Sequence, residues 1–247
     1  MNLKKIAHAL IATSLIGLTA CTASAEGENK AQAEIKAKLT KQLPGREVTA
    51  VNNTPMKGIY EVVLGGNMIV YTDAKAEYLL FGDMVDVVKR TSLTKERMDE
   101  LRKVDFAKLP LELAIKEVRG DGSRKLAVFS DPDCPFCKKL EQEGLKDISN
   151  ITIYTFLMPL AELHPDAARK SRVIWCAQDR TAAWKNWIHN GKLPEPAKDD
   201  CENPVARTVQ LGASLGISGT PGLIFANGRL VPGAIPRADI EKLLAEK

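Results

Sequence analysis

The sequence predicts two domains, a small strand-rich α+β domain and a larger α/β domain, joined by a linker helix. Three observations predict this. The chain has 247 residues, which is enough for two domains with separate cores. Short apolar and β-branched runs dominate residues 58–88, whereas strand and helix patterns alternate after residue 111. Between these regions, residues 94–108 are mostly charged and have only a narrow apolar stripe.

Residues 1–25 predict an export signal. Two lysines precede an apolar run at 6–18, and small residues follow at 23–25. The apolar run is shorter than the roughly 18 residues that a membrane-spanning helix needs, so export is favoured over an anchor. Residues 18–21 are also typical of a lipobox, in which cleavage before Cys21 leaves that thiol lipidated. Both endings of the signal stay open.

The net charge and the cysteine content limit the partners and the chemistry that the protein is expected to have. The formal net charge of +4 includes the two leader lysines, and so small a charge gives no indication of nucleic acid as a partner. Cys21 is either discarded or lipidated, which leaves four of the five cysteines. Several pairings of four cysteines are open, and the oxidising compartment of an exported protein lets disulfides persist.

The first domain is predicted over residues 26–90. Its polar start, 26–41, carries Ile35 and Leu39 four positions apart, which predicts a short amphipathic helix. Apolar runs with β-type composition then predict strands, and a glycine-rich turn at 65–67 joins the first two as a hairpin. The strand candidates are 59–64, 68–72, 78–81 and 84–88. A domain this small gains stability from pairing with a second copy.

The linker helix is predicted within residues 91–110. Thr94 is predicted to cap its start, and Pro110 stops it after residue 108.

Residues 111–247 predict an α/β domain with helices packed on a central sheet. The predicted strands are 111–118, 126–129, 151–158, 223–226 and 229–231. The predicted helices are 138–144, 166–189 with a bend, and 237–246. Asn227-Gly228 predicts a type I′ turn between the last two strands.

Two cysteines lie where the second of these strands meets a helix. Cys134 stands at the predicted helix start, where unpaired N–H groups and the helix dipole stabilise a thiolate. Pro135 suits the first helical turn because its φ is already helical and it has no N–H to lose. Cys134, at the exposed end of the helix, is therefore the predicted nucleophile. Cys137, one turn further in, is the predicted resolving thiol.

Neighbouring charges act on Cys134 in opposite directions. Asp131 and Asp133 raise its pKa, whereas Lys138 and Lys139 favour the thiolate. The helix dipole dominates if Cys134 is the cap.

A metal site is the alternative interpretation of the cysteine pair. Zinc needs four ligands, and no second close cysteine pair or suitably spaced histidine accompanies Cys134 and Cys137, so no metal is expected. Copper handling is a weaker alternative, since soft thiolates select Cu(I) but no Met- or His-rich tract supports it. His164 and His189 are predicted to be surface or capping residues, because neither lies near the motif in sequence.

Cys176 and Cys201 favour a structural disulfide. Cys176 follows an apolar helical segment and Cys201 ends a loop rich in Pro and Asp. A disulfide there would tie a long loop to a helix, which is worth about 2–4 kcal/mol. A purely structural bridge between Cys134 and Cys137 is not favoured, because so short a loop removes little unfolded-state entropy.

Gly219-Thr220-Pro221-Gly222 directly precedes a predicted strand, where a proline merely lacks a ladder donor. Together with the strand, C-x-x-C and helix upstream, however, this pattern resembles the thioredoxin fold. Four blocks are similar to the DsbC/DsbG family of periplasmic thiol:disulfide interchange proteins, most of all to DsbC: 129–131, 174–177, 215–221 and 227–233. The resemblance implies a cis-proline loop against the cysteine pair, with four residues forming the active-site loop and the substrate-binding surface: Pro135, Phe136, Thr220 and Pro221.

The resemblance also implies partners, location and chemistry. Two copies would dimerise through residues 58–88 and hold their redox sites across an apolar cleft that receives misfolded, disulfide-containing exported proteins. Cys134 would attack a wrong disulfide, Cys137 would resolve the mixed disulfide, and a DsbD-like membrane reductase would keep the pair reduced without any cofactor. The location would be the periplasm, with a lipid anchor at Cys21 if the lipobox is used. A DsbG-like reductase of oxidised single cysteines and a chaperone-type binding protein stay as alternatives.

Overall fold

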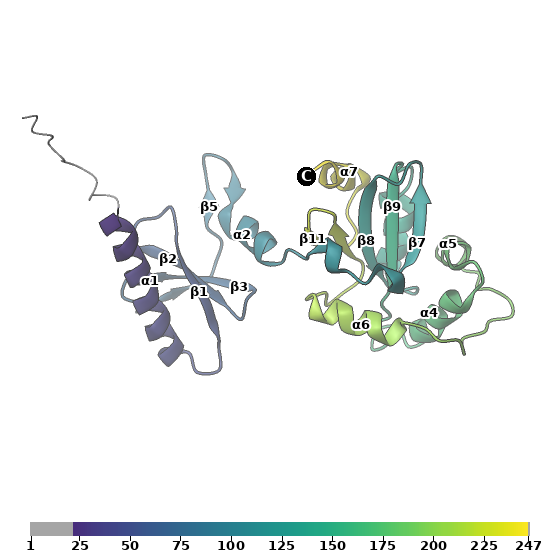
Figure 1. Cartoon of the computed structure of the whole chain (residues 1–247), viewed down its shortest axis with the longest axis horizontal. Coiled ribbons are helices and arrows are strands. Elements are labelled where there is room, and N and C mark those ends of the chain that lie inside the picture. Colours follow the sequence, from purple (N-terminus) through teal and green to yellow (C-terminus); the bar gives the residue numbers. More distant parts are fainter. Residues whose placement is uncertain (1–21, 247) are drawn as a thin grey trace, which may run out of the picture. The chain divides into compact units, whose positions relative to one another are not determined.

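The structure is a computed structural model, and it describes residues 22–246 (Figure 1). The predicted lipidation site, Cys21, and the export signal before it lie outside the described residues. The chain divides into two compact units, one ending at Met84 and the other beginning at Val85. Within the described residues, no helix combines the length and apolar character that crossing a bilayer requires.

The first unit is one helix packed on a four-stranded antiparallel sheet of order β1-β2-β3-β4 (Figure 1). Ile35 and Leu39 are both 2% exposed, so the predicted amphipathic helix and its buried face are confirmed. The hairpin around residues 65–67 is also confirmed. The elements are α1 (Thr22–Gln42), β1 (Val48–Asn53), β2 (Ile59–Leu64), β3 (Met68–Asp73) and β4 (Leu79–Leu80).

Strand β1 is absent from the sequence prediction. Its pairing register with β2 shifts between Val48 and Ala50, which places the buried residues Val48 and Val51 three positions apart. A bulge of this kind breaks the two-residue alternation that reveals a strand in a sequence.

The second unit begins with the short hairpin β5 (Val85–Asp86) and β6 (Thr91–Ser92), followed by helix α2 (Leu93–Leu101). The predicted cap and length of this helix are wrong. The Ser92 hydroxyl accepts the Lys95 N–H at 2.9 Å, so Ser92 caps the helix. The chain leaves the helix after Leu101, and Asp105 then caps a separate 3₁₀ turn by accepting the Ala107 N–H at 3.1 Å.

The core of the second unit is a five-stranded mixed sheet of order β11-β10-β8-β9-β7. Strands β8 and β9 are parallel, whereas the other neighbouring pairs are antiparallel. The strands are β7 (Ile115–Arg119), β8 (Arg124–Ser130), β9 (Ile151–Leu157), β10 (Gly222–Phe225) and β11 (Leu230–Pro232). The helices are α3 (Pro135–Lys139), which continues as a π-helical turn (Leu140–Gly144), α4 (Ala167–Cys176), α5 (Arg180–Asn190), α6 (Val205–Ser214) and α7 (Arg237–Ala245). Two 3₁₀ turns, Phe106–Lys108 and Leu111–Leu113, precede β7.

Helices cover both faces of this sheet (Figure 1). Strand β8 accordingly has buried side chains on both of its faces. Leu126 and Val128 are fully buried in a cluster with residues of α7 and the π-helical turn. Ala127 and Phe129 are fully buried on the opposite face, in a cluster with residues of α6. A strand buried on both faces reads as a continuous apolar run, which is the pattern that predicted it.

Three further differences from the sequence prediction have physical causes. The strand predicted at 111–118 starts at Ile115, because residues before it form a 3₁₀ turn. The helix predicted at 166–189 is two helices, because Asp179 accepts the Ala182 N–H and starts α5 anew. Helix α6, which the prediction omits, has no side-chain cap and packs Gly212 so closely that an added Cβ would lie 2.5 Å from Met158 Sδ.

The turn between β10 and β11 is not the predicted type I′ turn. Of Asn227 and Gly228, only Gly228 has a positive φ. The Gly228 N–H donates to the Phe225 carbonyl and the Phe225 N–H to the Arg229 carbonyl, so the loop has three residues and ends on a left-handed glycine. The Gly228 carbonyl in turn accepts the Val104 N–H at 2.8 Å.

Replacing Gly228 with alanine should destabilise the second unit by about 2–3 kcal/mol, because φ is strained and the Cβ would meet a backbone oxygen. That Cβ would lie 2.6 Å from the Val104 carbonyl oxygen. Gly233→Ala is the matched control, since φ is +81° there but no atom lies within 4 Å of the added Cβ. Urea unfolding followed by tryptophan fluorescence measures both, because all three tryptophans lie in the second unit. Equal losses in the two variants would contradict the close contact.

Candidate active site

Cys134 is the N-cap of helix α3, and Pro135 occupies its first turn. The pKa of Cys134 is lowered from 9.0 to about 5, mainly by a hydrogen bond from the Cys137 thiol. Thr220 and the backbone N–H groups of Cys137 and Phe136 lower it further, whereas burial opposes them. Cys134 is therefore a thiolate at neutral pH. It is only 5% exposed, which is less open than the exposed helix end that the sequence predicts.

Cys137 has the opposite properties. Its side chain is fully buried, and burial raises the pKa of its thiol far above the ordinary value. Donation of its proton to Cys134 raises that pKa further, while the Ser130 hydroxyl and the Asp131 N–H lower it. The Asp131 N–H lies 3.4 Å from Cys137 Sγ. The pair thus consists of one thiolate and one protonated thiol.

Asp131 connects both cysteines to the rest of the site. It follows β8 directly and is fully buried. Its carbonyl accepts the Cys134 N–H at 3.2 Å, and its N–H meets the Cys137 sulfur. Its carboxylate accepts two further backbone N–H groups, those of Asp133 and Leu160, each at 2.7 Å. The turn before the helix is therefore fixed from both its main chain and a buried side chain.

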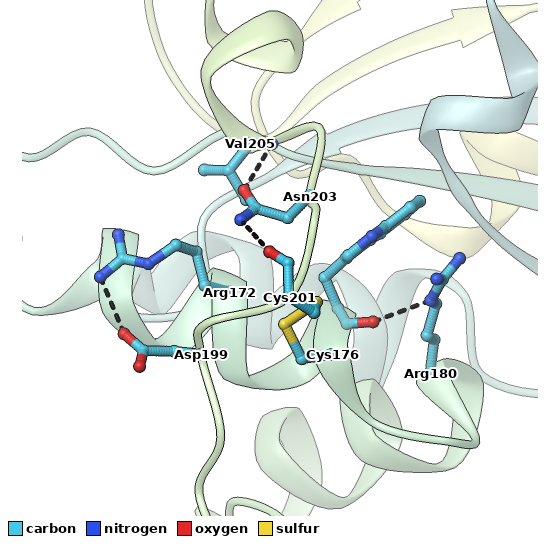
Figure 2. The surroundings of a disulfide bond; sticks show 8 residues. Arg172, Cys176, Arg180, Asp199, Cys201, Asn203 and Val205 are labelled. Carbon is cyan, nitrogen blue, oxygen red and sulfur yellow. Dashed lines mark hydrogen bonds and ion pairs between the residues drawn. A yellow bond between two sulfur atoms is a disulfide. The ribbon is translucent and has the colours of Figure 1, made fainter.

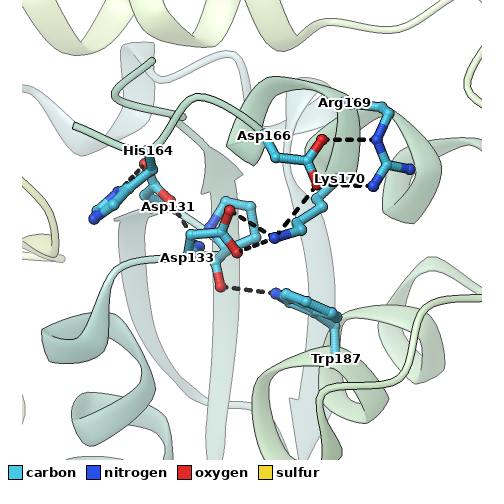
Figure 3. Close-up of polar contacts among 8 residues, drawn as sticks. Asp131, Asp133, His164, Asp166, Arg169, Lys170 and Trp187 are labelled. Atoms are coloured by element: carbon cyan, nitrogen blue, oxygen red, sulfur yellow. Dashed lines mark hydrogen bonds and ion pairs between the residues drawn. The ribbon is translucent and has the colours of Figure 1, made fainter. Parts of the chain in front are cut away.

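Helices α4 and α5 hold the same turn from another side (Figure 3). Lys170 Nζ lies 2.7 and 2.8 Å from the two Asp133 carboxylate oxygens. The Trp187 indole N–H donates to the Pro132 carbonyl at 2.7 Å, and Lys170 Nζ lies 4.8 Å from the centre of the Trp187 ring. Asp133 is therefore paired, and it opposes the Cys134 thiolate less than its position in the sequence suggests.

His164 is the functional neighbour that sequence reasoning missed. Its Nδ1 lies 3.0 Å from Asp131 Oδ2, beside the cysteine turn rather than at a distant surface (Figure 3). Asp131, and to a lesser degree the Cys134 thiolate, raise the pKa of His164 above its ordinary value. The separation of 33 residues gives no local pattern that would reveal this contact.

The loop before β10 lies against Cys134. The Thr220–Pro221 peptide bond is cis, and the Thr220 carbonyl oxygen lies 3.4 Å from Cys134 Sγ. Gly222 pairs with Phe129 of β8, which brings this loop to the end of the strand that carries the cysteine turn. Phe136, between the two cysteines, is 62% exposed. An apolar side chain and a backbone segment thus border the reactive sulfur.

Cys176 and Cys201 form a disulfide between the end of α4 and the loop before α6 (Figure 2). The Asn203 amide donates to the Cys201 carbonyl, and Arg172 on α4 pairs with Asp199 at 2.9 Å. These contacts hold the loop at residues 191–204 against the helix that also carries Lys170. Within residues 22–246, no group of three or more His, Cys, Asp or Glu side chains is arranged to hold a metal ion.

A thiolate at a helix start, a buried partner thiol and an adjoining cis-proline loop at the end of a central sheet define a thiol–disulfide oxidoreductase of the thioredoxin fold. Comparisons with known proteins agree. The thioredoxin-like domain model matches residues 111–247, and the model of the disulfide bond isomerase protein N-terminal domain matches residues 23–95. The chain belongs to the DsbC family of thiol:disulfide interchange proteins.

Individual relatives are similar over most of the chain. The probable thiol:disulfide interchange protein DsbC of Bordetella pertussis is 42% identical over 221 residues, which are 90% of this chain and 77% of that protein. The thiol:disulfide interchange protein DsbC of Escherichia coli K12 is 28% identical over 203 residues, 82% and 83% of the two chains. The crystal structure of a disulfide interchange protein from Neisseria gonorrhoeae is 51% identical, with a TM-score of 0.53 over 55% of this chain and 96% of that one.

The lowered pKa of Cys134 predicts how stability changes with pH. A pKa lowered from 9.0 to about 5 stabilises the reduced form fully above pH 9.0, and this stabilisation is lost as the pH falls towards 5. The oxidised form has no thiolate and lacks this contribution. The melting temperature of the reduced protein, relative to the oxidised one, should therefore fall on acidification across this range. Cys134→Ala should remove the ultraviolet thiolate absorbance that titrates near pH 5, and an unchanged titration would contradict the assignment.

Removing the Cys176–Cys201 disulfide should weaken the fold without changing the thiolate. The double variant Cys176→Ala, Cys201→Ala should lose about 2–4 kcal/mol of unfolding free energy, because the freed loop gains entropy in the unfolded chain. The Cys134 titration should stay in place, because the disulfide makes no contact with either active-site sulfur. A shifted titration in a variant that still folds would show that the loop supports the site directly.

Proposed function

We propose that the protein isomerises wrong disulfides in misfolded exported proteins, with Cys134 as nucleophile and Cys137 as resolving thiol. The observation that carries this proposal is the difference between the two sulfurs, one a thiolate next to the cis-proline loop and the other a fully buried thiol. Exchange needs a thiolate that attacks and leaves readily, and a second thiol that acts only when exchange stalls.

The reaction begins when the Cys134 thiolate attacks one sulfur of a client disulfide. The client S–S bond breaks, its other sulfur leaves as a thiolate, and a mixed disulfide joins Cys134 to the client. A client thiolate then attacks the mixed disulfide or another client disulfide, and the final attack releases Cys134. The numbers of thiols and disulfides are unchanged, so no net electron transfer occurs.

Cys137 supplies the way out of a stalled mixed disulfide. It loses its proton and attacks Cys134 Sγ, which releases the client sulfur as a thiolate that takes up a proton. The client has then gained two electrons, and the enzyme holds a Cys134–Cys137 disulfide. A DsbD-like membrane reductase would return the pair to its reduced form.

The client is proposed to bind along the surface that borders Cys134. Phe136 offers an exposed aromatic ring. The main chain at Thr220, held beside Cys134 by the cis Thr220–Pro221 bond, would pair with an extended segment. Pro135 completes the active-site turn beside Phe136. Contacts to the main chain suit a protein that acts on many misfolded sequences.

We also propose that the first unit forms a homodimer and that the protein acts in the periplasm. The match to the N-terminal domain of disulfide bond isomerases supports the dimer. Edge strand β4 is only two residues long, and apolar side chains around it are exposed: Tyr78 by 71%, Leu80 by 56% and Phe81 by 71%. Burying such a surface against a second copy stabilises both. Export by residues 1–25 would bring the protein to the periplasm, with Cys21 as the anchoring site if it is lipidated.

The test is reactivation of scrambled, disulfide-mispaired ribonuclease by the reduced protein. Wild type should restore activity, Cys134→Ala should fall to the rate without enzyme, and Cys137→Ala should keep exchange but accumulate mixed disulfides. Reactivation that survives Cys134→Ala would contradict the proposal. Reduction of a sulfenylated client without reactivation would indicate the DsbG-like reductase, and suppression of aggregation alone by the double cysteine variant would indicate a chaperone.

A further inference from the structure

The loop between β9 and α4 carries His164, which takes no direct part in the exchange between Cys134, Cys137 and the client. The main chain fixes His164 in place, since its N–H donates to the Leu160 carbonyl at 2.8 Å and its carbonyl accepts the Ala167 N–H at 3.1 Å. Leu160 itself donates to Asp131. The imidazole is 23% exposed and contacts a carboxylate that is fully buried. The contact is therefore built into the fold rather than made by a mobile surface side chain.

The charged groups that act on His164 are anionic, and the nearby cations, Lys170 and Arg169, pair with other carboxylates. Asp131 and the Cys134 thiolate are the anionic groups that act on it, together with Asp133. Lys170 of α4 pairs with Asp133 and also lies 3.5 Å from Asp166, while Arg169 pairs with Asp166. Glu162, on the same loop, is exposed. No lysine or arginine within the described residues pairs with Asp131, so only His164 can balance that carboxylate.

We propose that His164 is a positioning residue for thiol–disulfide exchange: its imidazolium balances the buried Asp131 carboxylate beneath the cysteine turn and so favours the Cys134 thiolate. An unbalanced carboxylate in a buried position would repel a nearby thiolate. The imidazolium removes this repulsion and leaves the hydrogen bonds of Asp131 to the turn intact. The proposal rests on the role of Cys134 as the nucleophile.

The interaction must act in both directions. If protonated His164 favours the Cys134 thiolate, then the thiolate favours protonated His164 by the same free energy. Oxidation to the Cys134–Cys137 disulfide removes the thiolate charge. His164 should therefore bind its proton more tightly in the reduced protein than in the oxidised one. A histidine that only packed against the turn would not show this dependence.

His164→Asn is the first test, because an asparagine amide can replace the Nδ1 donor without its charge. The Cys134 thiolate, followed by ultraviolet absorbance, should titrate about 0.5–1 unit higher than in wild type. At pH 7 the glutathione equilibrium should shift about three- to tenfold towards the disulfide, because each unit of Cys134 pKa changes the stability of the reduced form tenfold. The difference should vanish at alkaline pH, where wild-type His164 is neutral too.

His189→Asn is the matched control. His189 is the other histidine outside the predicted export signal, and burial and Lys185 lower rather than raise its pKa. It should leave the Cys134 titration unchanged. The Cys134 titration and the glutathione equilibrium need no client protein. They can therefore contradict the role of His164 while ribonuclease is still reactivated, and they can support that role if ribonuclease is not reactivated.

Wild-type protein provides a second test that does not depend on a folded variant. The imidazole proton resonances of His164, titrated by NMR in the reduced and oxidised protein, should give a higher pKa in the reduced state. Equal values in the two states, or a Cys134 titration in His164→Asn that matches wild type, would overturn the proposal. A shift in His189→Asn as large as in His164→Asn would overturn it as well, because the effect would then not depend on contact with Asp131.

Discussion

The buried carboxylate of Asp131 fixes the turn on which both cysteines depend. Its position follows from sheet topology. Strand β8 ends at Ser130, pairs in parallel with β9 as far as Leu157 and pairs with β10 at Gly222. The segments after β8, after β9 and before β10 therefore converge at one end of the sheet. Asp131 is the first residue of the segment after β8, and its carboxylate accepts N–H groups from Asp133 in that segment and from Leu160 in the segment after β9. The segment before β10 reaches the same place through the Thr220 carbonyl oxygen, which lies 3.4 Å from Cys134 Sγ. Removing its carboxylate would leave two backbone N–H groups without an acceptor.

Anchoring a turn with an acid has an electrostatic cost beside a thiolate. The fold offsets this cost with two basic side chains from different elements, His164 beside Asp131 and Lys170 beside Asp133. With both carboxylates paired, the hydrogen bonds from the Cys137 thiol and the helix backbone determine the state of Cys134. The site thus combines rigid hydrogen bonding by carboxylates with a local charge balance that tolerates a thiolate.

The sequence predicts what local patterns encode and misses what long-range contacts decide. Helix α1, the β2–β3 hairpin and the redox pair each have a short signature: apolar spacing, a glycine turn, or two cysteines at a helix start. Strand β1 has no such signature because a bulge hides its alternation, and α6 has none because its glycine and lack of a capping side chain weaken the helical signal. The contact of His164 with Asp131 spans 33 positions in the sequence, and that of Lys170 with Asp133 spans 37. Only the sheet brings these pairs together, so their types and spacing reveal nothing in advance.

If Cys134 and Cys137 have the proposed roles, the opposite shifts of their pKa values favour isomerisation of client disulfides over net reduction of the client. In a mixed disulfide, Cys134 is the better leaving group because its thiolate is stabilised, so a client thiolate that attacks the client sulfur releases the enzyme readily. Resolution by Cys137 must first remove a proton from a fully buried thiol, whose pKa is raised by burial. A client thiol that can reach the mixed disulfide therefore meets a lower barrier than Cys137 does. Cys137 completes the reaction when no client thiol is within reach, and the site then acts as a reductase.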